Sequence, residues 1–163
     1  FNTGHTCRKF CCDKWMCQRC DAETSTCKPA LVKASNYDHL MSCQGSVVID
    51  PAFIPTSNGC GPKGWKGGLV PENPYGFPFG PCCDAHDECY GICLKSQYAC
   101  DNEFGNCLDR ACDPCRANPA LCDDTLCSRL AYLYYYAVAQ NGEPHWKEGQ
   151  VTGCACCGIL SLQ

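Results

Sequence analysis

The clearest hydrophobic pattern in the chain covers residues 123–141. Leu126, Leu130, Leu133 and Ala137 recur there at helical spacing, so all four fall on one face of a predicted helix. The other positions include most of the tyrosine-rich run YLYYYA. Such a pattern favours a helix with one side in a core and ordinary surface on the other. The alternative is that the tyrosines face lipid or a partner.

Two further helices are predicted before this one. The first covers about residues 81–95, with Pro81 as a favourable first-turn residue. The second begins after Ser96, a possible N-cap, and ends before Pro114. Residues 59–81 are so rich in glycine and proline that they predict an irregular loop. A short β-prone run lies within residues 46–58, which we interpret as an extended connection.

Cysteine content changes the picture most, because 21 of the 163 residues are cysteines. This proportion is typical of a secreted, extracellular protein whose disulfides stabilise a thin core. Metal clusters are the weaker alternative, since the chain has only four histidines. The odd number implies one free thiol or an interchain disulfide partner. Because the chain does not start with Met, we expect a mature form whose targeting segment has been removed.

The distribution of cysteines also suggests two parts. Six of them lie within residues 1–27, which read as a loop-rich, disulfide-stapled module. We therefore predict a Cys-rich N-terminal extension over residues 1–42 and a main domain over residues 43–163. The formal net charge of −4 argues against a nucleic-acid partner and against strong attraction to anionic membranes.

The cysteines of the first two predicted helices have matching spacings. Cys82 and Cys89 are seven residues apart, as are Cys100 and Cys107. Seven residues is close to two helical turns, so each pair lies along one face of its helix. If the helices run antiparallel, Cys89 faces Cys100 while Cys82 faces Cys107.

The same geometry orients the stretch CCDAHDECY, residues 82–90. His86 falls on the face that looks at the second helix, where Asp101 is the leading acidic partner and Glu103 the runner-up. Asp87 is turned about 100° further round, toward the glycine-rich loop. Cys83 must bond something outside the helix pair, and Cys60 is the obvious choice.

These positions suggest a specific chemistry. A histidine oriented by a carboxylate can act as a general base that activates water. A carboxylate with backbone carbonyls can bind Ca²⁺, which would polarise an ester carbonyl. For an isolated His-Asp dipeptide, a packed histidine beside a solvated carboxylate is the more frequent situation. A metal phosphohydrolase needs further histidines, and His5, His39 and His145 lie in unsuitable segments.

The motifs together resemble the secreted phospholipase A2 family. CCDAHDECY resembles its active-site helix, with the pattern CCxxHDxCY, and NGCGP at residues 58–62 resembles its calcium loop. CDNEFGNCLDRAC resembles its second long helix, and the spacing is most similar to the group XII type. The resemblance covers about residues 58–112. It implies a mainly α, disulfide-rich fold with two long antiparallel disulfide-linked helices and an irregular calcium loop.

The resemblance also implies roles for individual residues. His86 would be the base, Asp101 its orienting partner, and Tyr90 a further member of their hydrogen-bond network. Asp87 would bind calcium through its carboxylate. The remaining ligands would be backbone carbonyls of Gly59, Gly61 and Lys63, and the Gly61 N–H would help to bind the oxyanion.

The loop between Cys60 and Cys83 is longer than is usual in this family. The inserted stretch contains six large apolar residues, namely Trp65, Leu69, Val70, Tyr75, Phe77 and Phe79. One hypothesis is that they dock on lipid, because exposed aromatic and aliphatic side chains suit the bilayer interface. The equally weighted alternative is that they pack beneath the loop.

We therefore interpret the protein as a secreted, calcium-dependent hydrolase that acts in lipid degradation and lipid metabolism. The predicted reaction is hydrolysis of the sn-2 ester of glycerophospholipids to a fatty acid and a lysophospholipid. We expect peripheral contact with a phospholipid membrane or micelle surface. The alternative is a non-catalytic phospholipase A2-like binding or toxin protein, although His86, Asp87 and Asp101 are all present.

Overall fold

The computed structural model describes residues 17–21, 26–61 and 70–157. They fall into two compact units, one within residues 1–53 and 151–163 and the other over residues 54–150. The predicted division into residues 1–42 and 43–163 stays a prediction.

The first unit is built from short strands and disulfides. Its elements are β1 (Gln18–Asp21), β2 (Thr26–Pro29), β3 (Leu31–Val32), α2 (Tyr37–Met41), β4 (Ser46–Ile49) and β5 (Cys154–Cys157). β1 and β2 form an antiparallel pair, and β5 lies between β3 and β4 in a second antiparallel sheet. Disulfides join Cys17 to Cys157 and Cys43 to Cys156. The β-prone run predicted from the sequence contains β4.

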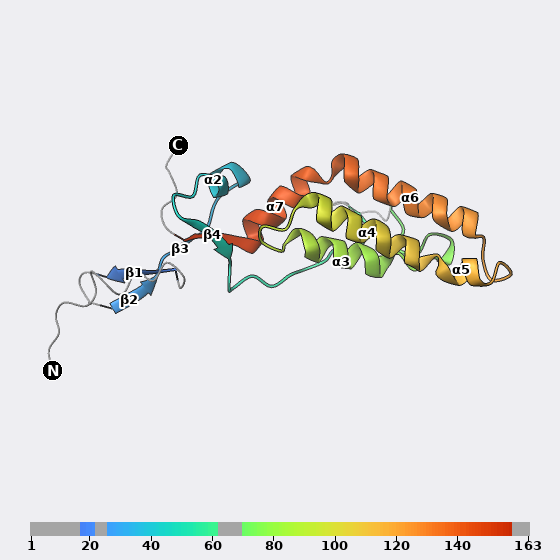
Figure 1. Cartoon of the computed structure of the whole chain (residues 1–163), viewed down its shortest axis with the longest axis horizontal. Coiled ribbons are helices and arrows are strands. Elements are labelled where there is room, and N and C mark those ends of the chain that lie inside the picture. The colour runs from blue at the N-terminus through green and yellow to red at the C-terminus, as the bar shows by residue number, and fades with distance from the viewer. Residues whose placement is uncertain (1–16, 22–25, 62–69, 158–163) are drawn as a thin grey trace. The chain divides into compact units, whose positions relative to one another are not determined.

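The second unit is helical. Its elements are η1 (Pro74–Gly76), α3 (Gly80–Tyr90), α4 (Gln97–Ala111), α5 (Asp113–Ala117), α6 (Asp124–Asn141) and α7 (Glu143–Gly153), the last three residues of α7 being assigned to the first unit. Helices α3, α4 and α6 lie side by side, with α4 contacting both others (Figure 1). The predicted mainly α, disulfide-rich fold is confirmed.

Local capping explains where two of these helices begin. The Ser96 side chain accepts a hydrogen bond from the Ala99 N–H, and Asp123 accepts one from the Leu126 N–H. Each cap satisfies a backbone donor that has no partner within the helix. Both start positions agree with the sequence prediction.

The first predicted helix is too long at its C-terminal end. α3 ends at Tyr90, and Leu94, within the predicted helix, has a left-handed backbone with φ of 64°. The buried Gln150 side chain accepts from the Leu94 N–H and donates to the carbonyls of Tyr90 and Ile92. A side chain far away in the sequence therefore replaces the helical hydrogen bonds of this turn.

The buried face of α6 differs from the predicted one. Cys127 and Ala131 are buried, whereas Leu133 is 57% exposed and Ala137 is also exposed. The disulfide between Cys112 and Cys127 holds this side of α6 against the core. Leu126 and Leu130 remain at the edge of the core.

The tyrosine run of α6 has two sides. Tyr134 and Tyr135 pack against the core, while Tyr132 and Tyr136 are exposed. One side of the run therefore belongs to the core, and the choice between ordinary surface and a lipid- or partner-facing surface for the other side stays a prediction.

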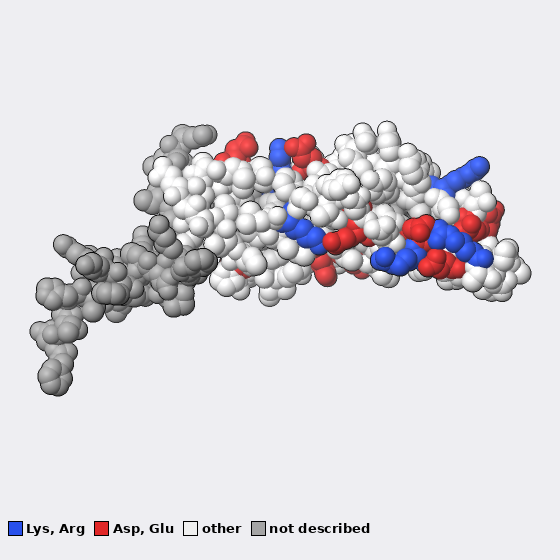
Figure 2. All heavy atoms as spheres, viewed as in Figure 1, with Lys and Arg blue, Asp and Glu red and all other residues white. Residues whose placement is uncertain are grey.

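Charged side chains of both signs share the surface of the helical unit. Arg116 contacts Asp109, Asp113 and Asp124. In the face shown in Figure 2, basic groups likewise lie next to acidic ones. Among the described residues, no helix combines the length and apolar character that a membrane crossing requires.

The burial of Leu108 on α4 and the exposure of Leu133 on α6 can be tested by a pair of leucine substitutions. Leu108→Ala removes a side chain with no exposed surface and should lower the free energy of unfolding by about 2–5 kcal/mol. Leu133→Ala removes a mostly exposed one and should change it by less than about 0.5 kcal/mol. Urea denaturation with disulfides intact measures both, and equal losses would contradict the assignment.

Candidate active site

Two disulfides set the register of α3 against α4. Cys82 bonds Cys107, and Cys89 bonds Cys100. A third disulfide joins Cys83 to Cys60 and attaches the glycine-rich loop to α3. All three pairings predicted from the sequence are present.

This register brings His86 and Asp101 into contact. His86 Nε2 lies 2.8 Å from Asp101 Oδ1, and the Tyr90 hydroxyl donates to the same oxygen at 2.7 Å. All three residues are buried. Glu103, the other acidic candidate, forms an ion pair with Lys95 instead. The structure thus selects Asp101 as the partner of His86.

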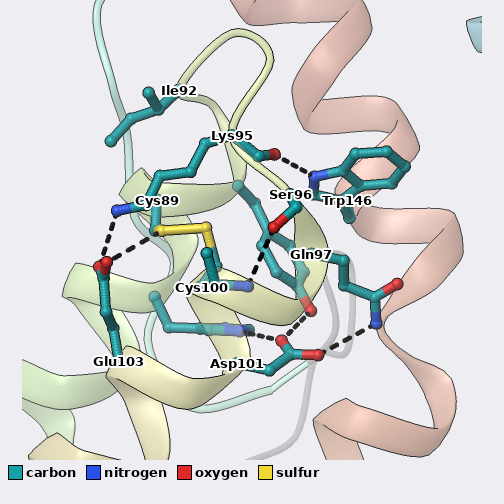
Figure 3. Close-up of a disulfide and its surroundings, with 12 residues drawn as sticks. Cys89, Ile92, Lys95, Ser96, Gln97, Cys100, Asp101, Glu103 and Trp146 are labelled. Carbon is teal, nitrogen blue, oxygen red and sulfur yellow. Dashed lines mark hydrogen bonds and ion pairs between the residues drawn. A yellow bond between two sulfur atoms is a disulfide. The ribbon is translucent and has the colours of Figure 1, made fainter.

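The second oxygen of Asp101 has a partner that sequence reasoning missed. Gln97 Nε2 donates to Asp101 Oδ2 at 3.1 Å from one helical turn earlier on α4, as Figure 3 shows. Gly142, at the end of α6, lies against this network. A Cβ at Gly142 would clash with the Tyr90 hydroxyl and lie 3.3 Å from Gln97 Nε2. Only glycine allows this close approach.

These contacts determine the protonation of the network. Burial alone would raise the pKa of Asp101, but hydrogen bonds from His86, Tyr90 and Gln97, together with the charge of His86, hold that pKa below its usual value. Burial and the bond to Asp101 raise the pKa of Tyr90. Asp101 is therefore an ionised acceptor and Tyr90 a neutral donor.

The two ring nitrogens of His86 have different environments. Nε2 faces Asp101, and the ring packs against Tyr90 and Phe104, with centroids at 4.2 and 4.7 Å. Nδ1 makes no hydrogen bond with the described residues. It is the nitrogen that can accept a proton.

Asp87 lies on α3 beside the start of the glycine-rich loop. Its Oδ2 accepts the backbone N–H of Asn58 at 2.9 Å. Burial raises the pKa of the Asp87 carboxyl, while the Asn58 hydrogen bond acts in the opposite direction. A bound cation would favour its ionised form.

The oxygen atoms at this position fit a calcium ion. Asn58 Nδ2, in the amide orientation that its neighbours require, donates to the Gly61 carbonyl at 3.2 Å and to Asp87 Oδ2 at 3.1 Å. A carbonyl and a carboxylate oxygen therefore converge on one atom. Hard oxygen ligands in such an arrangement suit Ca²⁺. The described residues contain no group of three His, Cys, Asp or Glu side chains able to hold a metal, but carbonyl ligands do not require one.

The other loop residues that were predicted to bind calcium or the oxyanion differ in their contacts. Gly59 is buried, with φ of 82°, and its carbonyl accepts the Gly61 N–H at 3.0 Å. The N–H predicted to bind the oxyanion therefore has an internal partner in this conformation. Lys63 lies outside the described residues. The Glu72 carboxylate, which sequence reasoning did not consider, lies against Gly59.

The apolar residues of the insertion do not all face outward. Phe77 and Phe79 are buried in the core, and the Phe79 ring packs edge-on against Tyr134 at 5.2 Å. The lipid-docking hypothesis is wrong for these two residues, because they anchor the loop to the helices. Tyr75 is 81% exposed, Val70 is half-buried, and Trp65 and Leu69 lie outside the described residues.

The contacting residues that the sequence analysis did not identify differ in how far the sequence could have indicated them. Gln97 stands four residues before Asp101 on the same helix, so helical spacing could have identified it. Asn58 and Glu72 had no such local relation to Asp87. Gly142 directly follows the predicted helix over residues 123–141, and its role depends on contacts with residues about 50 positions away.

Comparison with known proteins gives a partial match. A stretch of 76 residues is 32% identical to the group XIIA secretory phospholipases A2 of Homo sapiens and Mus musculus. The match covers 46% of this chain and 40% of the length of each relative. No family model matches the chain, and no solved structure matches it. The chain is therefore distantly related to the secreted phospholipases A2.

The low pKa of Asp101 predicts how stability depends on pH. Since the folded pKa lies below the unfolded value of about 3.9, the stabilisation is complete above that pH and is lost as pH falls through the folded pKa. Asp101→Asn should lower the free energy of unfolding at neutral pH, and this difference should shrink at a second, acidic pH below the unfolded value of about 3.9. Urea denaturation at both pH values measures it.

The matched control is Glu88→Gln, which removes one exposed carboxylate from α3. If the free energy of unfolding of Glu88→Gln differs from that of the wild-type protein in the same pH-dependent way, the hydrogen bonds to Asp101 do not cause the pH dependence.

Proposed function

We propose that the chain is a secreted, calcium-dependent phospholipase A2 that hydrolyses the sn-2 ester of glycerophospholipids. The products are a fatty acid and a lysophospholipid. The observation that carries this proposal is the buried His86–Asp101 pair, in which His86 Nε2 is held by Asp101 and Asp87 is next to His86 in the chain. The distant relationship to group XIIA secretory phospholipases A2 supports the same reaction class.

In this mechanism His86 is the base. Nδ1 accepts a proton from water as the water oxygen attacks the ester carbonyl carbon, and Asp101 stabilises the resulting imidazolium through Nε2–H. When the tetrahedral intermediate collapses, His86 returns the proton to the departing lysophospholipid oxygen. Asp101 does not rotate, because both of its oxygens are held by donors.

The cation would be held next to this base. Asp87 and the carbonyl oxygens of Gly59, Gly61 and Lys63 are its proposed ligands. When bound, Ca²⁺ would polarise the ester carbonyl and stabilise the oxyanion. The Gly61 N–H could add a second oxyanion contact only after it leaves the Gly59 carbonyl.

The proposed setting is extracellular, at the surface of a phospholipid membrane or micelle. The disulfides of both units support an oxidising environment. The net charge of −4 favours neutral over anionic lipid surfaces.

The central test is fatty acid release from phosphatidylcholine vesicles by the full chain. Release should require calcium and stop on addition of EDTA. His86→Gln should reduce it by about 10²–10⁴-fold, because proton transfer by a positioned base contributes that factor. His39→Gln, on α2, is the control and should retain full activity.

If the His86→Gln protein releases fatty acid at the wild-type rate, the mechanism is wrong. Binding of wild-type protein to vesicles without any release would instead favour a non-catalytic phospholipase A2-like protein.

The Gln97 contact gives a second prediction. Gln97→Met keeps the length of the side chain but removes the donor to Asp101 Oδ2, which lets the carboxylate and His86 shift. The Gln97→Met substitution should lower kcat by up to about a hundredfold while KM changes little. The reason is that a shift of a catalytic group by about 1 Å can reduce the rate by that factor. Gln140→Met, at an exposed position of α6, is the matched control. A fall in both proteins, or in neither, would argue against a positioning role.

A further inference from the structure

The side chain of Asn58 occupies the point where the proposed calcium ligands converge. Its Nδ2 donates to the Gly61 carbonyl oxygen at 3.2 Å and to Asp87 Oδ2 at 3.1 Å. The opposite amide orientation would place Asn58 Oδ1 against these two acceptors, which gives no hydrogen bond. The amide nitrogen thus satisfies both oxygens.

The backbone of Asn58 is held separately from its side chain. Its N–H donates to Asp87 Oδ2 at 2.9 Å, and the neighbouring Cys60 is bonded to Cys83 on α3. These contacts keep Asn58 beside Asp87 whichever way its amide is turned. The amide can therefore rotate without movement of the loop.

Rotation about the last side-chain bond of asparagine exchanges a donor for an acceptor. This torsion is broad and roughly two-fold, so neither orientation carries a large intrinsic strain. With the amide turned by about 180°, Oδ1 replaces Nδ2 at the convergence point. Asn58 Oδ1, Gly61 O and Asp87 Oδ2 then form three oxygen ligands of the type that Ca²⁺ accepts.

We propose that Asn58 exchanges with the cation, its amide nitrogen capping Gly61 and Asp87 without metal and its amide oxygen binding Ca²⁺ once the ion enters. The inference rests on the proposed function, because it assumes that this site binds calcium. It adds a side-chain ligand on the loop itself. It also explains why the two converging oxygens have a partner in the structure.

The test compares calcium affinity across three side chains at position 58, measured by isothermal titration calorimetry of the full chain with calcium chloride alone. Asn58→Ala removes the ligand and should weaken binding about tenfold or more, the usual size of effects close to a metal. Asn58→Asp keeps an oxygen at the same reach and adds a charge, so it should bind at least as tightly as the wild-type protein. Asn106→Ala, at an exposed position of α4, should leave the affinity unchanged.

The outcomes separate this inference from the proposed function. A wild-type protein that binds no calcium overturns the calcium site as a whole, and the inference with it. If the wild-type protein binds calcium, tighter or unchanged binding by Asn58→Ala overturns the exchange alone, because Asn58 would then be only a competitor or a bystander. Weaker binding by Asn58→Asp than by Asn58→Ala has the same meaning. Circular dichroism and urea unfolding of each variant confirm that the compared proteins are folded.

Discussion

The register between α3 and α4 is the constraint on which the candidate site depends. Two disulfides, Cys82–Cys107 and Cys89–Cys100, fix it at points two helical turns apart on each helix. His86 lies between the two bonds on α3 and therefore meets Asp101 on α4 at hydrogen-bond distance. In a chain with few large apolar residues in its core, covalent bonds provide a rigidity that packing alone would not. The same bonds restrict the unfolded chain, so stability and site geometry have one origin.

The buried polar network is stable because each of its members has a partner. Asp101 accepts hydrogen bonds from His86, Tyr90 and Gln97, which compensates for the burial of its charge. The end of α6 can cover this network because Gly142 has no side chain. A carboxylate held at both oxygens keeps the histidine ring in one orientation. Precise placement of His86 is thus a consequence of satisfying the buried charge of Asp101.

The proposed cation site is built differently from the proposed base. Asp87 lies on a rigid helix, whereas its partners come from a loop whose backbone carbonyls and N–H groups also bond one another. Phe77 and Phe79 anchor the inserted stretch in the core, and Cys60 ties the start of the loop to α3. The loop is therefore positioned at its two ends by contacts with the helices.

The sequence by itself determined the features that depend on local spacing. The helix start positions follow from capping residues, and the two disulfides between α3 and α4 and the facing of His86 toward α4 follow from helical periodicity. The remaining disulfide, Cys60–Cys83, follows from the need of Cys83 for a partner outside the helix pair. Tertiary structure alone decided the choice of Asp101 over Glu103, the buried face of α6, the inward packing of Phe77 and Phe79, and the contacts of Asn58 and Gly142. It also decided the pairing of β5 with β3 and β4. The physical reason is that periodicity reports which residues share a face, whereas the neighbour of that face is set by the packing of segments far apart in the chain.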